Sequence, residues 1–102
     1  YYEVSVEPDY SLSRLYYQKA SLAGHADSQF SMALRYRSGV NGFIQDTVEA
    51  YAWYNVCAAS GYADAISARD LLEGQMISVQ KAAGQKRSRE ILKEIEANKA
   101  KK

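Results

Sequence analysis

Cysteine, proline and glycine are scarce in this chain. Of its 102 residues, one is Cys, one is Pro and six are Gly. A single cysteine excludes an internal disulfide, and so few helix-breaking residues permit long helices. No apolar run approaches the roughly 20 residues that cross a bilayer, so we expect no membrane span.

The net charge is also small, and it is unevenly distributed. A formal charge of +1 argues against a protein built mainly to bind nucleic acid. Residues 78–102 hold eight Lys or Arg against three Glu, whereas residues 1–77 hold five against nine Asp or Glu. The last segment is therefore chemically distinct. With 47% apolar and 25% charged residues, the chain has the composition of one globular domain.

An internal repeat organises the first two-thirds of the chain. Sliding the sequence by 37 residues superposes it on itself without a gap. Tyr16 falls on Trp53 and Ala20 on Cys57, which are similar pairs. The identical pairs are Asp9 and Asp46, Tyr17 and Tyr54, Gly24 and Gly61, Ala26 and Ala63, Asp27 and Asp64, and Leu34 and Leu71.

Each repeat unit has the pattern of two helices. Asp46 and Glu49 have the spacing of a capping box, which predicts a helix that Gly61 ends in a left-handed conformation. The earlier copy of this helix runs from Asp9 to Gly24. The helix from 46 to 60 is apolar nearly all round, which predicts cover on two sides, as in stacked helical hairpins.

The second helix type spans residues 26–37 and recurs over residues 63–72, where Gly74 ends it. Its expected inward positions follow the helical period and are Gln29, Met32, Ala33 and Tyr36.

The last helix is expected to start at Ser78 as its N-cap and to run towards Asn98. Gly84 weakens it by about 1 kcal/mol relative to Ala. Its expected apolar side consists of Val79, Ala82, Ala83, Ile91, Leu92 and Ile95. An apolar side opposite a charged side is typical of the helix that closes an open stack.

The sequence thus predicts an all-α fold, an α/α superhelix or solenoid of about two helical-hairpin repeats plus a C-terminal capping helix. We expect three parts: a linker or partial element at 1–8, which has a strand-like alternation, repeats at 9–77, and a capping helix with a basic tail at 78–102. The chain begins with neither Met nor a charged-then-apolar leader. We therefore expect a mature form or a fragment of a longer array.

Residues 9–74 resemble the Sel-one-like repeat family, whose tetratricopeptide-like units are helix pairs. The matching residues are Ala26, Ser28, Phe30, Met32, Ala33, Tyr36 and Gly39, followed by Asp46, Ala50, Trp53, Tyr54, Cys57, Ala58 and Gly61. The loop between Gly39 and Gly42 is one residue longer than the family's, and Ala33 replaces the usual Gly. The resemblance implies an adaptor that binds proteins or peptidoglycan-related partners. For bacterial members it also implies export, so an exported or periplasmic location is favoured over a cytoplasmic one.

The residues that could carry chemistry have simpler structural interpretations. His25 follows Gly24 in a turn, and Cys57 takes the place of Ala20, so neither has the spacing of a metal or thiol site. Asp27 and Asp64 lie in first helical turns, where a carboxylate favours the helix dipole. The sequence therefore predicts no catalytic residue, no metal and no cofactor.

A modest binding groove is predicted where the second helix type lines the inner surface of the stack. Its residues are Asp27, Phe30, Leu34, Arg37, Asp64 and Leu71. An apolar centre with a charged rim is typical of peptide recognition. Packing of Phe30 and Leu34 on a neighbouring helix is the alternative.

We therefore expect a non-catalytic adaptor that binds a protein or peptide. A homo-oligomeric scaffold, a cell-envelope-associated protein and a cell-wall-related enzyme remain as alternatives.

Overall fold

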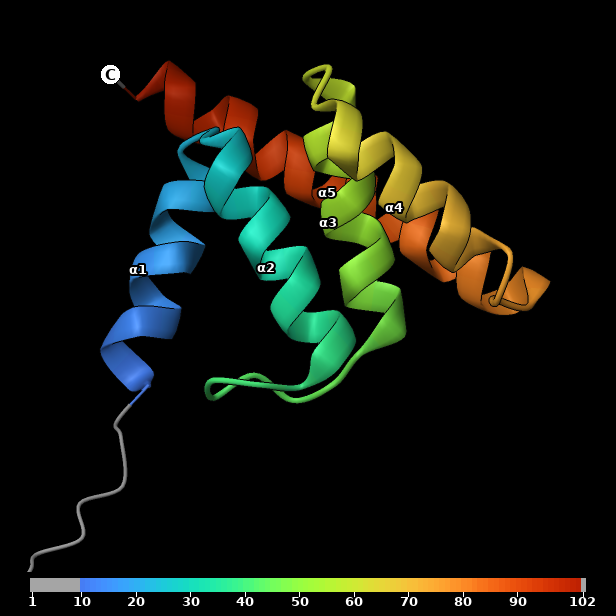
Figure 1. The fold of residues 1–102 in the computed structure, drawn as a ribbon. Helices are drawn as coiled ribbons and strands as arrows, with labels where there is room; N and C mark the ends of the chain where they lie inside the picture. The colour runs from blue at the N-terminus through green and yellow to red at the C-terminus, as the bar shows by residue number, and fades with distance from the viewer. Residues whose placement is uncertain (1–9, 102) are drawn as a thin grey trace, which may run out of the picture.

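Within residues 10–101, which the computed structural model describes, the chain is helical and has no strand. The helices are α1 Ser11–Leu22, α2 Ala26–Ser38, α3 Thr47–Ala59, α4 Ala63–Glu73 and α5 Ser78–Ala100 (Figure 1). The prediction of an all-α fold is confirmed at this level. The strand-like pattern expected at 1–8 lies outside the described residues.

The helix α3 begins and ends as predicted, except that its capping box is incomplete. Oδ1 of Asp46 accepts a hydrogen bond of 3.0 Å from the backbone N–H of Glu49, so Asp46 is the N-cap. The capping box is not completed, because the backbone N–H of Asp46 donates to the carbonyl oxygen of Tyr36 at 2.8 Å, and the carboxylate of Glu49 bonds to Arg87. Gly61 follows α3 with φ +86°, the left-handed conformation that glycine adopts without strain.

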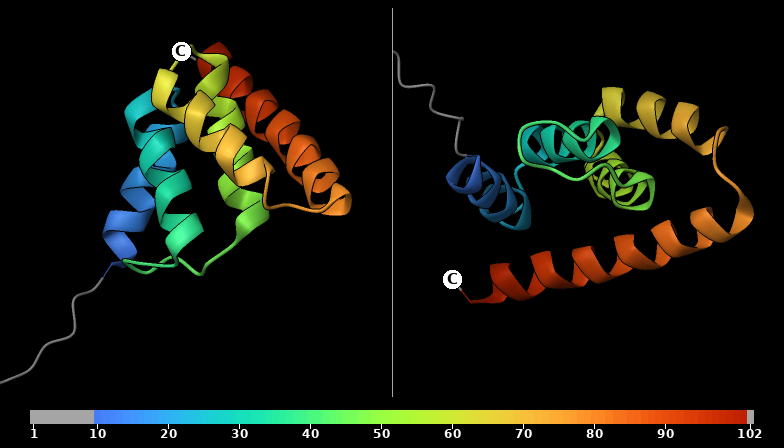
Figure 2. Two further views of the ribbon diagram at one scale, coloured as in Figure 1. Left: turned by 45° about the vertical axis from the view of Figure 1, so that its right-hand side comes forward. Right: turned by 90° about the horizontal axis from the view of Figure 1, so that it is seen from below.

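The helix α3 lies at the centre of the molecule. It packs against α2, α4 and α5, and α1 packs against α2 (Figures 1 and 2). Seven of its residues are buried: Ala50, Tyr51, Ala52, Trp53, Tyr54, Val56 and Cys57. Cover by three helices explains why α3 is apolar nearly all round.

The residues of α2 that were predicted to face inward do so, and they include the polar Gln29. Met32 and Ala33 are buried and Tyr36 is half-buried, and the rings of Tyr36 and Phe43 are nearly perpendicular with centroids 5.0 Å apart. Gln29 is buried too, and its Nε2 donates to the carbonyl oxygen of Ser21 at 3.0 Å. This bond ties α2 to the end of α1 and offsets the burial of the amide.

The side of α5 that packs inward agrees with the prediction at Ile91 and Ile95 but differs from it over the first turns and at Leu92, which is 39% exposed. Gly84, Ser88, Ile91 and Ile95 are buried against α3 and its surroundings, whereas Val79, Ala82 and Ala83 are exposed. Asn55 Nδ2 donates to Ser88 Oγ at 3.1 Å, which joins α3 to α5. The reason is steric: small residues let the two helices approach closely, so they form the contact.

The start of α5 also differs. Ser78 is the first residue of the helix and not its N-cap, which is Ile77. The backbone N–H of Ile77 donates to Gln80 Oε1 at 3.1 Å, so Gln80 supplies the capping contact.

The path of α5 leads back across the molecule. Viewed from below, it runs along one side of the other helices from the end of α4 to a place beside α1 (Figure 2). Asn98 Nδ2 donates to the carbonyl oxygen of Leu22 at 3.2 Å, which fastens the end of α5 to the end of α1. The expected closing helix thus packs chiefly on α3 and reaches α1.

Candidate functional site

The predicted groove residues lie on α2 and at the corresponding positions of α4. Leu34 on α2 is 40% exposed and Leu71 on α4 is 60% exposed. Asp27 and Asp64 are exposed in the first turns of the two helices, and Arg37 is half-buried near the end of α2. We call this surface the α2/α4 face.

Phe30 is the member of this set that serves packing. Its ring is half-buried, stacks on Tyr62 with centroids 5.2 Å apart, and lies 5.9 Å from the ring of Tyr54. These contacts join α2 to the start of α4 and to α3. Of the two interpretations left open by the sequence, packing therefore holds for Phe30, while Leu34 stays accessible.

The acidic end of the α2/α4 face interacts with the same aromatic residue. The carboxylate of Asp27 raises the pKa of the Tyr62 phenol above its usual value. Asp27 therefore has a local partner as well as its place in the first turn of α2.

Cys57 is a buried, unreactive thiol. Its Sγ–H donates to the carbonyl oxygen of Ala26 at 3.3 Å, and burial raises the pKa of the thiol to about 11. A nucleophile or metal ligand requires the thiolate, which this environment disfavours at neutral pH. The interpretation of Cys57 as a small buried residue agrees with this setting.

Within residues 10–101, no group of three or more His, Cys, Asp or Glu side chains could hold a metal ion. None of the helices described here is long and apolar enough to cross a membrane. His25 occupies the N-cap position of α2 without a capping bond from its side chain.

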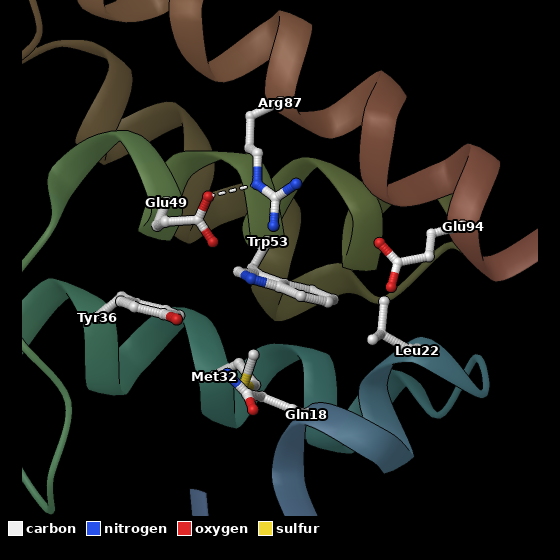
Figure 3. Close-up of a pocket in the computed structure, with 8 residues that line it drawn as sticks. All are labelled: Gln18, Leu22, Met32, Tyr36, Glu49, Trp53, Arg87 and Glu94. Carbon is white, nitrogen blue, oxygen red and sulfur yellow. Dashed lines mark hydrogen bonds and ion pairs between the residues drawn. The ribbon is translucent and has the colours of Figure 1, made fainter. Parts of the chain in front are cut away.

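A cavity of about 230 Å³ lies where α1, α2, α3 and α5 meet (Figure 3). It is lined by Gln18, Leu22, Met32, Tyr36, Glu49, Trp53, Arg87 and Glu94. Trp53 is 3% exposed, and its Nε1 is buried with no hydrogen-bond partner. An indole N–H in this state can donate to an acceptor that enters the cavity.

An ion pair forms part of the wall of this cavity. Arg87 Nε lies 2.5 Å from Glu49 Oε1, and Arg87 Nη1 lies 3.5 Å from Glu90 Oε1. Burial acts to lower the pKa of Arg87, but the bonds and charges of Glu49 and Glu90 together outweigh it and raise the pKa. Burial, followed by the charge of Glu49, raises the pKa of Tyr36. The cavity thus combines apolar side chains, such as Leu22 and Met32, with polar groups of both charges, among which the indole N–H of Trp53 has no partner.

Sequence reasoning did not find this cavity. It predicted that the helix holding Trp53 is covered on two sides, and Trp53 is buried, but it did not bring Gln18, Glu49 and Arg87 together. The last two are 38 positions apart, and no local pattern pairs them.

Comparison with known proteins gives one partial similarity. Chitin synthase regulatory factor 4 of Schizosaccharomyces pombe is 35% identical over 68 residues, which are 67% of this chain and 10% of that protein. The chain therefore spans about a tenth of the length of this relative. No family profile matches the chain, and no solved structure matches it.

Proposed function

We propose that this chain is a non-catalytic protein-interaction module with a regulatory or adaptor role. On this proposal its helices form a short solenoid of Sel-one-like repeats, and a protein or peptide partner binds on the α2/α4 face. The similarity to a regulatory factor supports such a role. The recurrence of helices 37 residues apart, as at Ala26 and Ala63, supports the repeat.

The composition of the α2/α4 face carries this proposal. Leu34 and Leu71 are large apolar side chains that are exposed to solvent, and Ile66 on α4 is 38% exposed as well. Asp27 and Asp64 are exposed in the first turns of the same two helices. An apolar centre with a charged rim excludes water at its middle and orients a partner at its edge.

The size of the face sets the expected strength of binding. It is built from two helices of 13 and 11 residues, which is small compared with the roughly 800 Å² per partner of a stable complex. We therefore expect weak and reversible recognition of one peptide segment.

A display library of 12-residue peptides, selected on the purified chain, tests this function. We expect the selected peptides to lose at least about tenfold in affinity on Leu34→Asp and on Leu71→Asp, because a charge would stand in the apolar centre. Val79→Asp is the matched control, since Val79 is 75% exposed but lies on α5. Peptides that bind all three variants equally well would exclude the α2/α4 face as the binding surface.

A further inference from the structure

We propose that the last turns of α5, residues 92–100, open and close while the remaining helices stay folded. We call this segment the strap. When the strap is closed it covers apolar side chains of α3, namely Trp53 and Val56, and when it is open these side chains are exposed. The strap is thus a conformational device that controls access to an apolar surface inside the fold.

The part of α5 that precedes the strap is packed firmly on α3. Gly84 lies so close to the ring of Tyr51 that a Cβ on the glycine would overlap the ring. Ser88 is buried, and its Oγ accepts a hydrogen bond of 3.1 Å from Asn55 Nδ2. Ile91, the last residue before the strap, is fully buried. These contacts hold α5 on α3 whether or not the strap is attached.

The strap itself is attached at two points. Ile95 is its one buried side chain and Asn98 is half-buried, while all its other residues are exposed. The Nδ2 atom of Asn98 donates to the carbonyl oxygen of Leu22 at 3.2 Å. None of the ion pairs within residues 10–101 involves the strap. A segment with so few buried apolar contacts separates from the fold at a lower free energy than the core does.

Cavities lie on both sides of the strap. The cavity at Trp53, of about 230 Å³, is lined by Glu94 (Figure 3), and a second cavity, of about 180 Å³, is lined by Leu92 and Lys99. Because a helix turns by about 100° per residue, Glu94 lies on one side of Ile95, and Leu92 and Lys99 lie on the other. Well-packed interiors leave few voids larger than a water molecule, so the two cavities mean that the strap is incompletely packed.

Opening of the strap would join the two cavities into one groove along α3. Trp53 lines the first cavity and Val56 the second, and each is 3% exposed. The two residues are three positions apart on α3 and therefore share one side of that helix. Leu22 of α1 lines the first cavity as well, at the edge of the same groove. The open chain therefore presents an apolar groove that the closed chain covers.

A detached strap is too short to remain a helix. Isolated helices of fewer than about 12–15 residues are marginal in water, so the strap unfolds when it leaves α3 and α1. Its amide N–H groups then lose their hydrogen bonds and exchange with solvent, whereas the amides of α5 up to Ile91 stay protected. Hydrogen exchange therefore reports the opening of the strap directly.

Native-state hydrogen exchange of the full chain, read by NMR, tests whether the strap opens alone. We expect the amides of residues 95–100 to share one protection factor, lower than that of the central turns of α3. Asp46→Ala removes the N-cap of α3, so it should speed exchange of the α3 amides about fivefold and leave residues 95–100 unchanged. Asn98→Ala should speed exchange of residues 95–100 about two- to tenfold, because it removes the bond that holds the strap.

Two results of this experiment would overturn the inference. If Asp46→Ala speeds exchange of residues 95–100 as much as that of α3, the strap opens only when the whole chain unfolds. A protection factor that falls steadily from residue 92 to residue 100 would indicate fraying of a helix end, without the opening of one unit.

The variant Ile95→Asp tests what opening exposes, because a carboxylate at this buried position favours the open strap. We expect residues 95–100 to lose their protection while the NMR signals of α2, α3 and α4 stay dispersed. Quenching of Trp53, the one tryptophan, by acrylamide should rise several-fold. Ala97→Asp is the matched control, since Ala97 is exposed in the same segment, and it should change none of these readouts. Unfolding of the whole Ile95→Asp variant, or unchanged quenching of Trp53, would refute the strap.

Discussion

Gly84 marks the closest approach between α5 and α3. It is buried, and a Cβ placed on it would overlap the ring of Tyr51. A glycine inside a helix is about 1 kcal/mol less favourable than alanine, so helix propensity alone favours replacement. Packing opposes that gain, because the ring of Tyr51 is itself 2% exposed and has little room to move.

Gly84→Ala should therefore destabilise the chain by about 1–2 kcal/mol in spite of its better helix propensity. Urea unfolding followed by circular dichroism measures the change. Gly74→Ala is the matched control, because Gly74 has φ −64° and a Cβ there would make only ordinary contacts. A stabilised Gly84→Ala variant would show that α5 does not pack this closely on Tyr51.

The ion pair between Glu49 and Arg87 should have a measurable coupling energy. The side chain of Arg87 is 38% exposed and that of Glu49 is 19% exposed, so solvent screens the pair only in part. A double-mutant cycle of Glu49→Gln and Arg87→Gln should give a coupling of about 1 kcal/mol, reduced at high salt. Arg89→Gln, at an exposed position of α5, should change stability by less than about 0.5 kcal/mol. A coupling of zero would show that the pair does not hold α5 to α3.

Cys57 should make stability depend on pH in the alkaline range. Burial raises its pKa from 9.0 to about 11, so the unfolded chain loses the thiol proton at lower pH than the folded chain. Stability from this group is complete below pH 9 and is lost as pH rises towards 11, by about 2 kcal/mol in all. The comparison is with Cys57→Ala, since Ala20 fills the equivalent position.

Tyr36 and Tyr51 also have raised pKa values, but they are present in the natural chain and in the Cys57→Ala variant alike. The difference in unfolding free energy between the two proteins should therefore shrink from pH 8 to pH 11. Parallel pH profiles would show that Cys57 is not buried as described.

At the scale of the helix, capping residues set where α3 and α5 begin. Asp46→Ala should cost about 1 kcal/mol, because the N–H of Glu49 would lose its acceptor. Ser78→Ala should be close to neutral, since Gln80 and not Ser78 caps α5. Thermal unfolding of both variants measures the two effects. Equal losses would mean that Ser78 caps its helix after all.

The ends of α3 could be predicted from the sequence, whereas the inward side of α5 could not. Asp46 and Gly61 are local signals, and they placed the ends of α3 correctly. The inward side of α5 was wrong over its first turns because Val79 is apolar yet 75% exposed. Hydrophobicity ranked it above Gly84 and Ser88, but close helix packing selects small residues, and no pattern within one helix reveals which neighbour comes close.

At the scale of the molecule, the all-α class followed from helical periodicity and the repeat, both of which are visible in the chain. The return of α5 to α1 was not predictable, because the bond from Asn98 to Leu22 joins residues 76 positions apart. The cavity around Trp53 depends on that return. On the α2/α4 face, the exposed positions of Leu34 and Leu71 followed from the helical period, whereas the stacking of Phe30 on Tyr62 required the tertiary structure.

Quenching of tryptophan fluorescence by iodide tests most directly the claim that equivalent positions of the two copies are enclosed on α3 and open on α1. The chain has one tryptophan, Trp53, which is 3% exposed, while the equivalent Tyr16 is 67% exposed. The comparison is between the natural chain and the double variant Tyr16→Trp, Trp53→Tyr. We expect blue-shifted, protected emission from Trp53, and red-shifted emission quenched several-fold more strongly from position 16. Equal quenching in the two proteins would contradict the enclosure of Trp53 and the exposure of Tyr16 in this structure.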